Sequence, residues 1–104
     1  MPQRDAIISY LNQYLEVGSI KDFAPVGLQV EGRDQVNRIV TGVSASAELF
    51  QRAADLKADM VMVHHGMFWE RDPRVVRGSL KKRLQILLLN EITLLGYQIG
   101  RAHV

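Results

Sequence analysis

The chain has 104 residues, which is enough for one small domain and too few for two. Its apolar share of 47% and charged share of 23% are those of an ordinary globular chain, and no apolar run approaches the ~18 residues of a membrane span. Because cysteine is absent, disulfides and thiolate metal sites are excluded, and any metal must be held by His, Asp or Glu. This composition agrees with a reducing cytoplasm, and the N-terminus is unlike a secretory signal.

The first half of the chain predicts one helix and two strands. Residues 4–17 carry apolar side chains at helical spacing, and Gly18 and Ser19 end the pattern. The segment GLQVEG, residues 27–32, is expected to hold a short strand between turns. Residues 36–45, VNRIVTGVSA, are rich in β-branched side chains and predict a longer strand. The apolar stripe of the helix consists of Ile7, Tyr10, Leu11, Tyr14 and Leu15.

A second helix and a buried strand follow. Either Ser44 or Ser46 is expected to cap this helix, with Glu48 in its first turn and Lys57 near its end. The run MVMVHH, residues 60–65, is typical of a buried strand. Strand, helix and strand in this order predict a βαβ unit with parallel strands and a right-handed crossover. The apolar stripe of the helix consists of Leu49, Phe50, Ala53 and Leu56.

The last third of the chain continues the alternation. Ser79 is expected to open a helix that ends near Asn90, and ITLLGYQI, residues 92–99, predicts a third strand. The fold class is therefore α/β, with a mostly parallel sheet flanked by helices. The apolar positions of the third helix are Leu80, Leu84, Leu87 and Leu88.

Six basic residues between positions 71 and 83 form a patch that could meet phosphate. Aromatic side chains, which nucleic-acid-binding surfaces use as stacking platforms, do not interleave with them. The pattern favours a solvated helix face, and we do not expect a nucleic-acid partner. The six residues are Arg71, Arg74, Arg77, Lys81, Lys82 and Arg83.

Two adjacent histidines, His64 and His65, close the buried strand. Ligands bind beyond the carboxyl ends of the strands in open α/β sheets, so the pair lies where a site is expected. Neighbouring strand residues point to opposite faces, so regular geometry would not let both imidazoles hold one ion, whereas two neighbouring ions fit better. Alternatively, the histidines simply end the strand and hydrogen-bond nearby backbone. Spacing alone leaves both interpretations open.

The remaining ligands of such a site are harder to find. Zinc sites usually use three or four protein ligands. Asp59 lies about 16 Å or more away along the strand and is excluded, whereas Glu70 and Asp72 are close in sequence and are candidates. The aromatic pair Phe68 and Trp69 is interpreted as core or interface cover.

Four segments of the sequence together resemble a known family. They are GLQVEG (27–32), VTGVSAS (40–46), ADMVMVHHGMFW (58–69) and the later pattern of Gly78, Lys82, Arg83, Leu84, Leu88, Leu89, Asn90 and Ile92. Their order is similar to that in the dinuclear metal centre hexameric protein family, often labelled type 2 GTP cyclohydrolase I. The resemblance covers residues 1 to about 98, and it implies that residues 1–98 are the N-terminal part of a larger dinuclear-metal α/β domain.

The resemblance implies a metal centre and an assembly. Family members are cytosolic toroidal hexamers that hold two divalent ions per subunit, and the two histidines of the HHG block bind one ion each. His64 and His65 would take those roles here, while catalytic residues stay unassigned. Zinc, iron, manganese and nickel are not distinguished, because imidazole suits several first-row metals.

The sequence departs from the family pattern near its end. Where the family has a ligand aspartate before Ala102 and His103, this chain has Arg101, whose charge opposes metal binding. The peptide IGRAHV, residues 99–104, is also the in-frame translation of ATC GGA AGA GCA CAC GTC, which matches a widely used sequencing adapter. We therefore expect residues 99–104 to be a non-native tail on a gene fragment.

Two functions from different classes fit the sequence and the resemblance. The first is a metal-dependent hydrolase of the type 2 GTP cyclohydrolase I kind, acting on a small molecule such as a nucleotide in the full-length parent. The second is a non-enzymatic metal-binding ring that acts as carrier, chaperone or regulatory scaffold. For the 104-residue chain itself we expect no activity, and we expect an uncovered sheet edge and apolar face.

Overall fold

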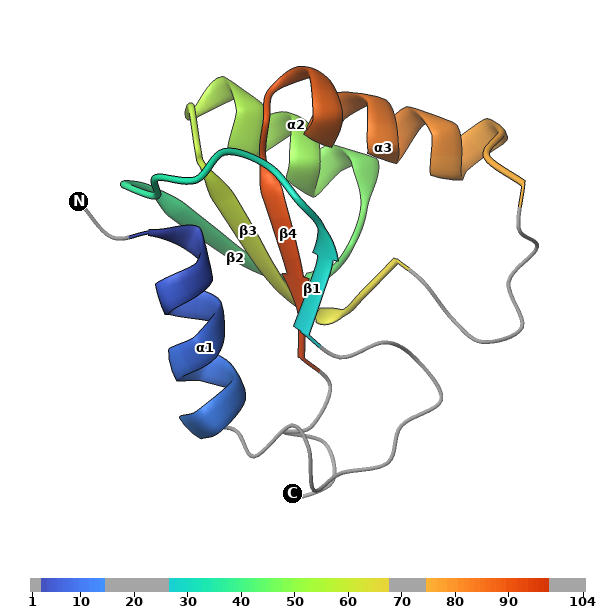
Figure 1. The fold of residues 1–104 in the computed structure, drawn as a ribbon. Helices are drawn as coiled ribbons and strands as arrows, with labels where there is room; N and C mark the ends of the chain where they lie inside the picture. The colour runs from blue at the N-terminus through green and yellow to red at the C-terminus, as the bar shows by residue number, and fades with distance from the viewer. Residues whose placement is uncertain (1–2, 15–26, 68–74, 98–104) are drawn as a thin grey trace.

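The computed structural model describes residues 3–14, 27–67 and 75–97. They form one four-stranded sheet in the order β1-β4-β3-β2, with helices on both sides (Figure 1). The elements in chain order are α1 (Arg4–Tyr14), β1 (Gly27–Val30), β2 (Ile39–Ser44), α2 (Ala47–Asp55), β3 (Met60–His65), α3 (Gly78–Leu89) and β4 (Thr93–Gly96). The expected α/β class is confirmed.

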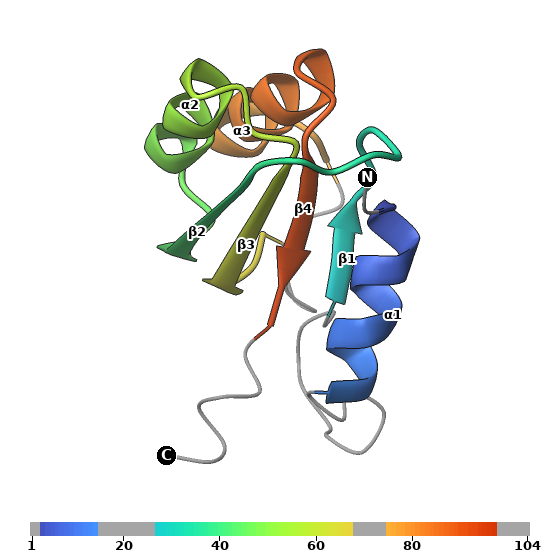
Figure 2. The same cartoon turned by 90° about the vertical axis from the view of Figure 1, so that its left-hand side faces the viewer.

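Three of the four strands are parallel. β2 pairs with β3 and β3 pairs with β4 in parallel register, and α2 and α3 make the connections between them. β1 joins the other side of β4 in antiparallel orientation. The arrowheads of β2, β3 and β4 therefore lie at one edge of the sheet in Figure 2, and that of β1 points the opposite way.

The two faces of the sheet bury different cores. On one face, Met60 and Leu95 pack with residues of α1, among them Ile7 and Leu11. On the other face, Val61, Val63 and Leu94 lie beneath α2 and α3. Figure 2 shows α1 on the opposite side of the sheet from α2 and α3. Strand alternation, in which successive side chains point to opposite faces, explains this division.

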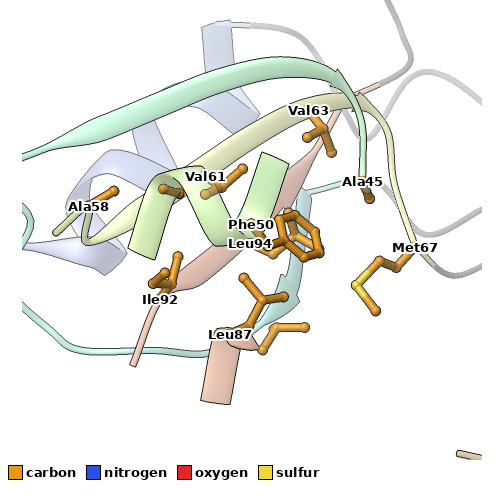
Figure 3. Close-up of a cluster of buried hydrophobic side chains, with 11 residues drawn as sticks. Ala45, Phe50, Ala58, Val61, Val63, Met67, Leu87, Ile92 and Leu94 are labelled. Carbon is orange, nitrogen blue, oxygen red and sulfur yellow. The ribbon is translucent and has the colours of Figure 1, made fainter. Parts of the chain in front are cut away.

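The larger core is centred on Phe50 of α2 and Leu87 of α3. Both side chains are fully buried, and Figure 3 shows them next to Leu94 at the centre of the cluster. Truncating a buried residue of this size to alanine costs about 3–5 kcal/mol for Phe and about 2–5 kcal/mol for Leu. Met67, just after β3, also reaches this core, so the chain beyond the histidine pair is anchored in it.

The three predicted apolar stripes of α1, α2 and α3 are only partly buried. Tyr10 and Tyr14 are exposed and stack on each other with ring centroids 6.0 Å apart, because α1 turns Ile7, Ile8 and Leu11 toward the sheet instead. Leu56 and Leu88, which were expected in the stripes of α2 and α3, are also exposed. Residues 15–17 of the predicted first helix lie outside the described residues.

The helix ends follow recognisable capping rules. Ser46, one of the two predicted caps of α2, accepts a hydrogen bond from the backbone N–H of Leu49 at 3.1 Å. α3 begins at Gly78, so Ser79 lies inside the first turn rather than opening the helix. Lys57 and Glu91 follow the ends of α2 and α3 with φ of 58° and 51°, the left-handed conformation that glycine usually supplies after a helix.

One edge of the sheet is open among the described residues. β2 pairs only with β3, and its Ile39 and Val43 side chains are exposed. The expected uncovered edge with apolar side chains is therefore present in the described part of the chain. None of the helices in that part is long and apolar enough to cross a membrane.

Candidate metal centre

The histidine pair lies at the carboxyl edge of the parallel strands. His65 is the last residue of β3, and in register it lies beside Ser44, the last residue of β2. The carbonyl oxygen of His65 accepts a hydrogen bond from the Ala45 N–H at 3.0 Å. On the other side, the Tyr97 N–H donates to the carbonyl oxygen of Val63 at 2.9 Å. The segments that follow β2 and β4 thus hold the end of β3, which carries the histidine pair, from both sides.

The two imidazoles lie next to each other. Their ring centroids are 4.6 Å apart and the rings meet edge to face, with an interplanar angle of 65°. Strand alternation predicted that they point to opposite faces, and that alternation holds along β3 only as far as Val63. The rings converge at the end of the strand, where Gly66 follows. The expectation that regular strand geometry points the imidazoles to opposite faces is therefore wrong, because both rings lie in one local region.

A backbone carbonyl orients His64. Its Nδ1 lies 3.1 Å from the carbonyl oxygen of Tyr97, the residue that follows β4. Because a carbonyl oxygen can only accept, this hydrogen bond requires the hydrogen on Nδ1, which leaves Nε2 as the nitrogen that could bind a metal ion. Histidines that bind metals almost always donate their second ring N–H in this way. The contact also fits the alternative prediction that the histidines bond nearby backbone, so the two interpretations are compatible.

Tyr97 is itself fixed by α1. Its side chain is buried, and its hydroxyl donates to Oδ1 of Asn12 at 2.8 Å. Burial raises the pKa of the Tyr97 phenol, so the hydroxyl remains a neutral donor over the ordinary pH range. The carbonyl that orients His64 therefore belongs to a residue held both by α1 and by the backbone of β3.

The turn after the histidines is packed against Gln29 of β1. Oε1 of Gln29 accepts a hydrogen bond from the Met67 N–H at 2.7 Å. A Cβ atom at Gly66 would lie 2.2 Å from Nε2 of Gln29, which real structures do not tolerate. Sequence reasoning missed Gln29; the only signal was its position in GLQVEG, a segment that the sequence marked as a short strand.

The described part of the chain adds no third ligand to the histidine pair. Within the described ranges, no group of three or more His, Asp or Glu side chains could hold a metal ion. Asp59 lies just before β3, at the opposite end from His65, and its carboxylate accepts from the N–H groups of Asn37 at 2.8 Å and Arg38 at 3.1 Å. Predicted site and cover residues that lie outside the described part of the chain are Phe68, Trp69, Glu70, Asp72, Arg101 and His103.

The basic patch is divided between structural and solvent-facing side chains. Nη1 of Arg83 donates to the carbonyl oxygen of Ala45 at 3.0 Å and so ties α3 to the end of β2. Arg77, Lys81 and Lys82 are exposed, as expected of a solvated helix face. Arg71 and Arg74 lie outside the described residues.

The sequence matches a protein family and named relatives. The sequence matches the profile of Duf34/NIF3 (NGG1p interacting factor 3) over residues 2–98. A Yersinia pestis relative named GTP cyclohydrolase 1 type 2 homolog is 49% identical over 89 residues, which are 86% of this chain and 36% of the relative.

Two solved structures share the fold at high similarity. Protein ybgI, described as of unknown function, has 45% identity and a TM-score of 0.90, covering 91% of this chain and 38% of that one. TTHA1606 from Thermus thermophilus has 34% identity and a TM-score of 0.87, covering 91% of this chain and 39% of that one. The chain thus spans little more than a third of the length of the relatives it matches.

Proposed function

The chain belongs to the Duf34/NIF3 (NGG1p interacting factor 3) family, and from this premise we propose that His64 and His65 are ligands of a divalent-metal centre. The family expected from the sequence motifs is thereby confirmed, whereas the metal centre is our proposal. The observation that carries it is the hydrogen bond from His64 Nδ1 to the Tyr97 carbonyl, because it leaves Nε2 as the ligating atom.

The donor chemistry of the pair fits a metal ion. Two imidazoles with centroids 4.6 Å apart present nitrogen ligands that zinc, iron, nickel and other first-row ions accept. Two ligands are fewer than a stable site needs, so the others must come from outside the described residues. We propose that this chain supplies one half of a site for two ions, with one histidine bound to each.

We further propose that the complete protein is a hydrolase acting on a small molecule of the nucleotide type. The name of the Yersinia pestis relative, GTP cyclohydrolase 1 type 2 homolog, supports this substrate class. A pair of divalent ions supplies Lewis acidity and an activated water for hydrolysis. In this chain, the Tyr97 carbonyl would orient the His64 ring, and the Ala45 N–H would hold the backbone of His65.

We propose a homo-hexameric ring in the cytoplasm. β2 is an edge strand, and its Ile39 and Val43 side chains are exposed. This apolar surface supports the proposal that another protein surface covers it. The absence of cysteine from the sequence agrees with a reducing compartment.

A non-enzymatic metal-binding ring, acting as carrier, chaperone or regulatory scaffold, is the second candidate. The hydrogen bond that leaves His64 Nε2 free to bind a metal ion would serve a carrier as well as an enzyme, and this observation supports the second candidate.

A zinc titration of the chain tests the metal centre. We expect a dissociation constant above the submicromolar range, since the described residues supply only two ligands. Zinc binding should be lost in both His64→Ala and His65→Ala. His103→Ala is the matched control and should bind as the unaltered chain does. Binding that survives both substitutions would overturn the proposal.

A turnover assay separates the two candidate functions. The zinc-loaded 104-residue chain should not hydrolyse GTP, whereas the metal-loaded product of the complete gene should do so and lose turnover in His64→Ala. Tight metal binding by the complete protein, without turnover of any nucleotide tested, would replace the hydrolase with the carrier or scaffold.

A further inference from the structure

We infer that Gln29 is a positioning residue for the histidine pair, holding both the turn after His65 and the segment that orients His64. The functional role of Gln29 rests on the proposed metal centre. The packing of its amide between two glycines is present without any metal.

A β-bulge aims Gln29 at the site. In the antiparallel pairing of β1 with β4, Leu28 lies opposite Leu95 and Val30 lies opposite Leu94, so Gln29 is an extra residue between them. Bulges of this kind bend the strand and redirect a side chain, and they are common beside functional sites. The bulge therefore explains why a polar side chain of β1 reaches across the end of β4.

The amide of Gln29 fills the space beside two glycines. A Cβ atom at Gly66 would lie 2.2 Å from its Nε2, and a Cβ atom at Gly96 would lie 2.8 Å from the same nitrogen. The Gly96 position also lies against Gly66, with 3.3 Å between that added Cβ and the Gly66 Cα. Any side chain at either glycine would displace the amide, so the two backbones can approach Gln29 only as glycines.

Each glycine adjoins one half of the candidate centre. Gly66 follows His65 directly, and Gly96 precedes Tyr97, whose carbonyl accepts from His64. The hydrogen bond from the Met67 N–H to Gln29 Oε1 adds a directional restraint on the turn. One side chain therefore fixes the spacing between the His65 backbone and the carbonyl that aims His64. Metal ligands must be held to within about 0.5 Å, so such a restraint matters for affinity.

The test compares two isosteric substitutions. Gln29→Met keeps the length of the side chain and removes the acceptor for Met67. Thr93→Val is the control: it removes the Oγ1 that accepts from the Gly32 N–H at 2.9 Å, a similar hydrogen bond near the far end of β4. Each variant removes a side-chain acceptor of a backbone N–H, and only Gln29→Met touches the histidine segments.

The first readout is the tautomer of His64 in the metal-free chain, from imidazole nitrogen chemical shifts. We expect Gln29→Met to lower the fraction protonated on Nδ1, and Thr93→Val to leave it unchanged. The second readout is zinc affinity, which should fall about 10-fold in Gln29→Met, the lower end of the effect of outer-shell partners.

Gly66→Ala tests the same contact in a second way, because the added methyl group would displace the Gln29 amide while the glutamine itself remains. If Gln29→Met does not fold, Gly66→Ala should show the same two changes. An unchanged His64 tautomer in the variants that fold would overturn the inference. If the unaltered chain binds no zinc, the metal centre fails instead, and the tautomer measurement still decides the role of Gln29.

Discussion

The hydroxyl of Tyr97 donates to Oδ1 of Asn12 across 2.8 Å and so joins the end of the last strand to the first helix. These residues are 85 positions apart in sequence, and the contact fixes α1 over the face of the sheet that carries Met60 and Leu95. The same Tyr97 offers its carbonyl oxygen to His64. Docking of α1 and orientation of the candidate ligand therefore depend on one residue.

Tyr97→Phe should lower the free energy of unfolding by about 1 kcal/mol, the net contribution of an ordinary hydrogen bond. Chemical denaturation followed by circular dichroism measures the change. Tyr10→Phe is the control: Tyr10 is exposed, so the change should stay within about 0.5 kcal/mol. Equal effects of the two substitutions would contradict the role assigned to the Asn12 contact.

Stability should fall in alkaline solution through the same residue. Burial raises the pKa of Tyr97 in the folded protein, so above the ordinary tyrosine value of about 10 the unfolded chain loses the proton first. The unfolded state is then favoured increasingly as the pH rises. We expect the stability advantage of the unaltered protein over Tyr97→Phe to shrink above that pH. An advantage that grows there would be inconsistent with a buried phenol.

Lys57→Gly should stabilise the protein. Lys57 has a φ of 58°, which costs a non-glycine residue about 1–2 kcal/mol, and glycine offsets part of the gain through its greater freedom in the unfolded chain. The expected net gain is about 0.5–1 kcal/mol.

Lys82→Gly is the matched control for that gain. It makes the same chemical change inside α3, where glycine costs about 1 kcal/mol relative to a good helix former. Thermal or chemical denaturation of both variants gives the comparison. Destabilisation by both substitutions would show that the left-handed conformation at Lys57 carries no strain.

Asp59→Ala should destabilise the fold without affecting metal binding. The buried carboxylate accepts from two backbone N–H groups and pairs with Nη1 of Arg33 at 3.2 Å. Losing hydrogen bonds to a charged group costs about 1.5–3 kcal/mol. Asp55→Ala, on the exposed side of α2, should change stability by less than about 0.5 kcal/mol. A selective loss of zinc affinity in Asp59→Ala would show that its exclusion as a ligand is wrong.

Local patterns in the sequence predicted most of the elements. The β-branched run that includes Ser44 forms β2, and the buried run that ends at His65 forms β3. The helical spacing of apolar residues correctly predicted α2 and α3. The choice between Ser44 and Ser46 as the cap could not be made in advance, because both precede the helix. It depends on which hydroxyl reaches the Leu49 N–H.

The parts of the site that the sequence did not predict are long-range. The role of Gln29 depends on a bulge created by pairing with β4, and no local pattern marks a bulge. The contact between His64 and Tyr97 joins positions 33 residues apart. The convergence of the imidazoles departs from the alternation that a regular strand imposes, so periodicity predicted the opposite.

The most direct test of the central claim follows the imidazole nitrogens of His64 during a zinc titration. Long-range proton–nitrogen correlation spectra of the His103→Ala chain, at mildly alkaline pH, report each ring nitrogen separately. The account predicts that Nδ1 of His64 stays protonated throughout, while Nε2 of His64 and the ring of His65 shift as zinc is added. Zinc-dependent loss of the Nδ1 proton, or no response of either ring in the folded chain, would contradict it.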